Sequence, residues 1–233
     1  NDKTKWADYG PDEYAGVTWA NTGTRRLFLG WMSNWDYANQ IPTSPWRSAN
    51  TIPRELGLKQ VGEEIYLTSQ PVKELGKLAV APRKLTGLTV KPVLDLTEQL
   101  GLKENKFMLR MKTLQLNDFT LVLSNSVGEE LRLGYDKGAN QYFVDRRKSG
   151  QTAFHEKFAG KHLTPRLATG PAADVTLYFD ATSVELFADG GLSVATELFF
   201  PSKPYTSVKL LAPDGLTVNE LTFSRLNDSM PTA

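Results

Sequence analysis

Hydrophobic and polar residues alternate with a period of two along most of the chain, and a helical period of 3.6 is rare. Between positions 174 and 189, Val175, Leu177 and Phe179 alternate with polar or smaller residues, and after a break at 180–182 the alternation resumes. This pattern predicts a β-hairpin, because successive side chains of a strand point to opposite faces of a sheet. Similar patterns predict strands over 14–20, 26–32, 49–52, 55–59, 64–69, 107–112, 119–124, 130–135, 141–146, 195–200, 206–211 and 218–224.

Turn-forming residues separate the predicted strands, and only one short stretch has the character of a helix. Asn, Asp and Gly mark turns at 21–23, 136–140, 189–191 and 213–215. The helical stretch covers 72–78, directly after Pro71, and is marginal on its own because of its length. The sequence therefore predicts an all-β fold class.

The pattern also divides the chain into parts. We expect a first unit over 1–70, a linker with the short helix over 71–90, and an antiparallel β-sandwich over 91–228, where roughly nine strands follow at even spacing. The short strands of 1–70 make a single sheet, which leaves two faces and two edges open. Two arrangements would cover it. It is one blade of a β-propeller stacked on other blades, or it packs on the sandwich as a third layer.

Composition separates the two ends of the chain and excludes several classes of function. All 5 Trp residues lie in the first 46 positions. The net charge of +1 argues against a nucleic-acid or anionic-membrane partner, which usually selects a basic excess. With 0 Cys and 2 His, disulfides, thiolate metal sites and His-rich metal sites are excluded. No stretch approaches the ~18 apolar residues of a membrane helix.

Aromatic, amide and carboxylate side chains are concentrated in two segments near the N-terminus. The segment 8–14 holds three carboxylates and two phenols in DYGPDEY, and 30–40 holds two indoles and several amides in GWMSNWDYANQ. This mixture suits a neutral polyol, because sugar C–H groups pack on aromatic rings while sugar hydroxyls need paired donors and acceptors. A Trp-rich core with a polar loop is the alternative interpretation.

These segments closely resemble the last propeller blade of glycoside hydrolase family 32, the levanase, inulinase and invertase family. The resemblance is carried by LGWMSNWDYANQIPTSPWRSANTIPREL over 29–56, by DYGPDEYA over 8–15 and by PVKEL over 71–75. Looser similarity to the family's C-terminal sandwich lies in GYD and FVDR within 134–146 and in DATSVELF over 180–187. The resemblance implies a five-bladed propeller followed by a β-sandwich.

The same family resemblance implies hydrolysis of β-fructosyl bonds with retention, which requires two carboxylates. The family's motifs for these groups are Asn-Asp-Pro, Arg-Asp-Pro and a Glu before Cys. The chain contains none of them, since Asn1-Asp2 is followed by Lys3 and there is no Arg-Asp pair and no Cys. We therefore expect no catalytic residue here and interpret the chain as the C-terminal portion of a β-fructosidase, inactive alone. The alternatives are a stand-alone fructan-binding module and a structural or oligomerisation sandwich.

By this resemblance, the blade carries the substrate-binding residues. Trp31 is expected to emerge at a strand end and give an apolar wall to the fructosyl ring, with blade packing as its alternative role. Asp12 and Tyr14 are expected to face the same pocket, and the loop after Trp31 is expected to set chain-length and linkage preference. The candidate residues are Trp31, Asp12, Tyr14, Asp8, Trp35 and Asn39, with Gln40 beside them.

Other conspicuous residues are given structural roles. We expect Trp46 and Arg47 to stack on each other, and Arg54-Glu55 to form an internal ion pair that stabilises the blade. Nothing in the sequence indicates that Ser183 and His155 belong to an Asp–His–Ser catalytic triad.

The implied partners are a fructan or fructosyl oligosaccharide and the N-terminal remainder of the propeller. No nucleic acid, membrane, cofactor or metal is expected. The resemblance alone implies an extracytoplasmic location.

Overall fold

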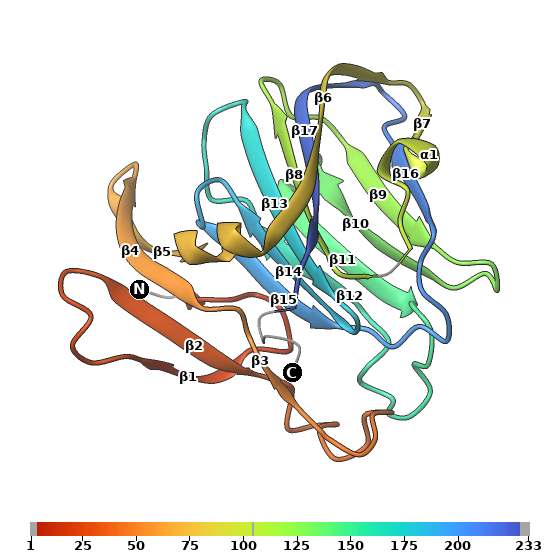
Figure 1. The fold of residues 1–233 in the computed structure, drawn as a ribbon. Coiled ribbons are helices and arrows are strands. Elements are labelled where there is room, and N and C mark those ends of the chain that lie inside the picture. Colours follow the sequence, from red (N-terminus) through yellow and green to blue (C-terminus); the bar gives the residue numbers. More distant parts are fainter. Residues whose placement is uncertain (1–3, 104, 229–233) are drawn as a thin grey trace.

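The N-terminal part of the chain forms one antiparallel sheet. In the computed structural model, which describes residues 4–103 and 105–228, its strand order is β1-β2-β4-β5, with the short β3 paired to β2 (Figure 1). We call residues 4–71 the blade. Its strands are β1 (Tyr14–Thr18), β2 (Arg26–Met32), β3 (Ala49–Asn50), β4 (Arg54–Val61) and β5 (Glu64–Pro71).

The following residues form two six-stranded sheets that enclose a continuous hydrophobic core. One sheet has the order β12-β11-β10-β9-β16-β7 and the other β15-β14-β13-β8-β17-β6. Alternating residues of both sheets fill the core, among them Leu121 and Leu133 from one and Leu177 and Leu221 from the other. The strands are β6 (Ala79–Val90), β7 (Val93–Asp95), β8 (Phe107–Thr113), β9 (Phe119–Ser124), β10 (Glu130–Asp136), β11 (Gln141–Lys148), β12 (Lys161–Pro165), β13 (Ala173–Asp180), β14 (Ser183–Ala188), β15 (Ser193–Leu198), β16 (Ser207–Leu211) and β17 (Leu216–Leu226).

The all-β fold class is confirmed, but the segment expected to be a linker contains a long strand. The expected short helix is present as the 3-10 helix η1 (Lys73–Leu78), and β6 follows it directly and pairs with β17. The pattern obscured β6 because Pro82 and Gly87 are strand breakers. An edge strand tolerates them, and β6 is the last strand of its sheet. Gly87 adopts a φ of 63°, which needs no strain in a residue without Cβ.

The alternation pattern did not predict three further short elements, because a period of two can be recognised only over several residues. They are the strands β7 and β12 and the helix α1 (Thr97–Leu100). No helix among residues 4–103 and 105–228 is long and apolar enough to cross a membrane.

The blade meets the sandwich along the free edge of β15. Strand β15 is the outermost strand of its sheet, and the blade lies beside it (Figure 1). The outward carbonyls of Val194 and Thr196 accept the backbone N–H groups of Tyr9 at 2.8 Å and Asp12 at 3.3 Å. The outward N–H groups of Thr196 and Leu198 donate to the carboxylates of Asp8 at 2.9 Å and Asp12 at 2.8 Å. Segment 8–12 thus completes the hydrogen bonding that an edge strand otherwise leaves open.

This docking requires a residue without Cβ at position 10. A Cβ on Gly10 would lie 2.2 Å from the carbonyl oxygen of Thr196. A second contact of this kind joins β5 to the β14–β15 turn, where Ser69 N–H donates to Gly191 O at 2.9 Å. A small apolar cluster of Met32, Tyr37, Ile41, Phe158, Leu198 and Phe200 fills the junction.

The blade otherwise leaves many large apolar side chains in solvent. Every residue of β1 is exposed, and Leu58 and Ile65 on β4 and β5 are 75% and 60% exposed. A sheet with such faces is not covered by the sandwich alone. The exposed large apolar residues of the blade are Trp6, Tyr14, Val17, Trp19, Trp35, Trp46, Leu58 and Ile65.

Candidate functional site

Three aromatic rings form a continuous solvent-facing surface on the blade. Tyr14 of β1 pairs across the sheet with Trp31 of β2, so both side chains lie on the same face. Their ring centroids are 6.3 Å apart in an edge-to-face arrangement, and the ring of Trp35 lies 4.9 Å from that of Trp31. Tyr14 is 53% and Trp35 69% exposed. We call these three rings the aromatic surface.

The loop 33–40, which carries Trp35, is ordered by Asn34. The carbonyl of Asn34 accepts the N–H groups of Tyr37 at 3.1 Å and Ala38 at 2.8 Å, and its side-chain oxygen accepts the N–H of Asp36 at 2.9 Å. Its amide nitrogen donates to the carbonyl of Pro11 at 2.8 Å. The loop is therefore tied to the segment that leads into Tyr14. Asn39 lies exposed on this loop, as does Gln40.

Asp12 lies in the blade–sandwich interface and not on the aromatic surface. It is 0% exposed, one oxygen accepts the Tyr37 hydroxyl, and the other pairs with Arg146 and accepts the N–H of Leu198. The expectation that Asp12 faces the pocket of Tyr14 is corrected by this placement. Its carboxylate is needed at the open edge of β15, a tertiary requirement that leaves no pattern in the local sequence.

Asp8 has the same kind of environment. Its oxygens accept the Arg54 guanidinium at 2.8 Å, the Thr196 hydroxyl at 2.7 Å and the N–H of Gly10 at 2.8 Å. The structure thus brings Tyr14, Trp31 and Trp35 together, and places Asp8 and Asp12 in the interface between the blade and the sandwich.

The interface is strongly charged despite its burial. Arg54 bridges Asp8 to Glu185 of β14, and Arg146 bridges Asp12 to Glu197 of β15. Burial by itself would lower the pKa of each guanidinium, but the neighbouring carboxylates outweigh it and raise both pKa values. Burial raises the pKa of the Glu185 carboxyl, and Arg54 opposes this. Arg54 does not pair with Glu55 as expected, because Glu55 binds Arg25 at 2.8 Å.

The expected stacking of Trp46 on Arg47 stays a prediction, since the contact described for the Arg47 guanidinium is a hydrogen bond to the carbonyl of Ile41 at 2.6 Å.

Glu13 is a polar residue of the blade that sequence reasoning passed over. Its carboxylate packs against Gly30, where a Cβ would lie 2.1 Å from Oε1. That oxygen is buried and has no hydrogen-bond partner among the described residues. Burial, followed by the charge of Asp8, raises the pKa of Glu13. The available signal was its position in the sequence, directly between the candidate residues Asp12 and Tyr14.

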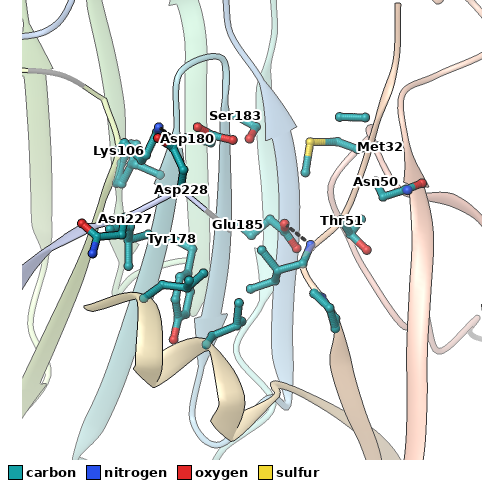
Figure 2. A pocket seen from close by; sticks show the side chains of 17 residues that line it. Met32, Asn50, Thr51, Lys106, Tyr178, Asp180, Ser183, Glu185, Asn227 and Asp228 are labelled. Carbon is teal, nitrogen blue, oxygen red and sulfur yellow. Dashed lines mark hydrogen bonds and ion pairs between the residues drawn. The ribbon is translucent and has the colours of Figure 1, made fainter. Parts of the chain in front are cut away.

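A separate cleft of about 330 Å³ lies between the blade and the sandwich (Figure 2). Met32, which follows Trp31 along β2, lines it together with Ala49 and Asn50 of β3. Glu185 reaches into its wall and accepts the N–H of Ile52 at 2.7 Å, the bond drawn dashed in Figure 2. Its other labelled lining residues are Thr51, Lys106, Tyr178, Asp180, Ser183, Asn227 and Asp228.

Comparison with known proteins matches both parts of the chain. Residues 1–71 match the glycosyl hydrolases family 32 N-terminal domain, and residues 74–227 match the family 32 C-terminal domain. The levanase of Bacillus subtilis is 36% identical over 232 residues, 96% of this chain and 34% of that protein. The extracellular exo-inulinase of Aspergillus awamori is 31% identical over 226 residues, 93% of this chain and 42% of that protein.

Solved structures give the same answer for the fold. The crystal structure of exo-inulinase from Aspergillus awamori superposes with a TM-score of 0.85 at 26% identity, covering 99% of this chain and 46% of that one. The β-fructofuranosidase of Schwanniomyces occidentalis, complexed with fructosyl-erythritol, shares the fold with a TM-score of 0.81 at 21% identity over 98% of this chain and 50% of that one. The expected combination of propeller blade and sandwich is therefore confirmed. The chain spans between a third and a half of these proteins, and it belongs to glycoside hydrolase family 32.

Proposed function

We propose that the chain supplies the last propeller blade and the C-terminal sandwich of a retaining β-fructosidase that acts on a fructan or fructosyl oligosaccharide. The observation that carries this proposal is the aromatic surface, which lies on the blade that matches the family's N-terminal domain. Its rings offer apolar faces to the C–H groups of a sugar, and its exposed position admits a polymer. Trp31 forms the wall for a fructosyl ring, and Tyr14, Trp35 and Asn39 line its approach.

The catalytic carboxylates belong to other blades in this proposal. The chain lacks the Asn-Asp-Pro, Arg-Asp-Pro and Glu-Cys motifs, so the chain alone is inactive. In this proposal the rest of the propeller packs on other exposed apolar residues of the blade, namely Val17 of β1, Leu58 of β4 and Ile65 of β5. An extracytoplasmic location is supported by the Aspergillus awamori relative, whose name describes it as extracellular.

The coding sequence before Asn1 gives the most direct test. We expect the three carboxylate motifs there, in that order, and release of fructose from levan, inulin or sucrose by the longer protein but not by this chain. An upstream sequence without the motifs overturns the hydrolase proposal, and so does fructose release by this chain alone.

A second candidate, a non-catalytic fructan-binding module, is favoured by the exposure of Trp35. Titration of this chain with levan- and inulin-type oligosaccharides, followed by Trp fluorescence, tests it. Trp35→Ala should weaken binding, whereas Trp6→Ala, which removes a similarly exposed indole outside the aromatic surface, should not. No binding by the unmodified chain removes this candidate and leaves the hydrolase proposal standing.

A further inference from the structure

We propose that Arg146, a residue of the sandwich, is a positioning residue for the aromatic surface of the blade. The inference rests on the proposed function only for the identity of the ligand. It gives the sandwich a specific part in building the sugar site, through one side chain that holds both blade segments carrying the rings.

Arg146 is placed to hold several groups at once. It lies on β11, is 0% exposed, and uses all three nitrogens of its guanidinium. Nε donates to Phe158 O at 2.6 Å and Nη2 to the Tyr37 hydroxyl at 2.9 Å, while Nη1 pairs with Asp12 and donates to Leu198 O at 3.1 Å. The guanidinium also lies 3.9 Å from the ring centroid of Phe158. Only a planar guanidinium, with several N–H donors held in fixed directions, can reach all of these acceptors at once.

Arg146, Asp12 and Tyr37 form a closed triangle, because the Tyr37 hydroxyl also donates to Asp12. Asp12 lies two positions before Tyr14, and Tyr37 lies two positions after Trp35. The triangle therefore fixes the segment entering β1 and the loop leaving β2 relative to each other. The bond from Asn34 to Pro11 at 2.8 Å joins the same two segments on the blade side.

The second buried arginine provides a matched comparison. Arg54 is equally buried and also joins a blade carboxylate to a sandwich carboxylate. Its partners are Asp8, Glu185 and Thr196, and none of them belongs to loop 33–40. Loss of either arginine leaves buried carboxylates unpaired and destabilises the interface, but only Arg146 contacts the loop that carries Trp35.

The test compares Arg146→Gln, Arg146→Lys and Tyr37→Phe with Arg54→Gln in the 233-residue chain. Hydrogen exchange is followed at the amides of Tyr37, Ala38 and Gln40, whose partners lie within the loop. We expect exchange there to rise about tenfold in Arg146→Gln, the size of one lost charge-assisted hydrogen bond, and less in Tyr37→Phe. Arg146→Lys should not restore protection, and Arg54→Gln should leave these amides unchanged while lowering the melting temperature.

Affinity for a fructo-oligosaccharide gives a readout that general destabilisation does not move below the melting transition. We expect Arg146→Gln and Arg146→Lys to raise Kd about tenfold, and Arg54→Gln to leave it within about twofold. Equal exchange in the Arg146 and Arg54 variants, or full rescue by lysine, overturns the proposal. If Arg146→Gln fails to fold, the Tyr37→Phe variant is used in its place. Unchanged hydrogen exchange in loop 33–40 of that variant would count against the proposal. If the unmodified chain binds no oligosaccharide, the binding-module function fails while the exchange comparison still tests Arg146.

Discussion

Nη1 of Arg54 lies 2.8 Å from Oδ2 of Asp8, and the same guanidinium reaches Glu185 across the domain boundary. Arg146 repeats this arrangement from the other side, with Asp12 in the blade and Glu197 in the sandwich. Two cations thus hold four carboxylates in a region that is almost free of solvent. Such pairs gain little over apolar packing when complete, but they are costly when one partner is removed.

Replacement of Arg54 by alanine is therefore expected to destabilise the chain by about 3–5 kcal/mol. Urea unfolding measures this free energy. Arg110→Ala is the control, because its pair with Asp174 is exposed and should contribute about 1 kcal/mol or less. Equal losses of unfolding free energy in the two variants would show that the buried pairs at the boundary stabilise the chain no more than an exposed pair does.

Gly10→Ala is expected to disturb docking of the blade on β15. The new Cβ would lie 2.2 Å from Thr196 O, and overpacking of this kind typically costs about 1–3 kcal/mol. Gly76→Ala places its Cβ in open space and should behave like the unmodified chain. Thermal unfolding compares them, and an unchanged melting temperature in Gly10→Ala would contradict the close approach described here.

Acid should weaken the attachment of η1 to the blade. Hydrogen bonds from Arg25 lower the pKa of Glu74 from 4.5 to about 2. Because the folded-state pKa is depressed, the contribution of Glu74 is present above pH 4.5 and is lost as the pH falls toward 2. The effect is small, since the pair is exposed. Melting temperatures between pH 2 and 6 should fall less steeply in Glu74→Gln than in Glu63→Gln, and parallel curves would refute the linkage.

The blade is expected to be less protected from hydrogen exchange than the sandwich. Strand β1 is wholly exposed, whereas β14 and β15 are wholly buried. Backbone hydrogen bonds under few apolar contacts open more readily. Native-state exchange on this chain measures the difference, and equal protection in β1 and β14 without a bound partner would contradict it.

The period of two was sufficient to locate most strands, and it failed where tertiary context decides. Strand β2 has the expected bounds, 26–32, because buried side chains alternate regularly with half-buried ones along it. Strand β6 was hidden by Pro82 and Gly87, which only an edge position tolerates. The pairing of Tyr14 with Trp31 follows from two adjacent strands. The burial of Asp8 and Asp12 could not be predicted, since it depends on the distant edge of β15. Asp8 binds Thr196, which is 188 residues away, and Asp12 binds Leu198, which is 186 residues away.

The capping of β15 by segment 8–12 has a consequence for self-association. A sandwich deprived of the blade would keep its core but present the outward backbone groups of Val194, Thr196 and Leu198 as an unprotected template. Another chain could add a strand there, which is the usual route from an open edge to aggregation. The two aspartates occupy these donors with side chains that cannot propagate a ladder. The blade thus protects the edge of the neighbouring sheet within the same chain, and we expect that a sandwich produced without the blade would be less soluble than the whole chain.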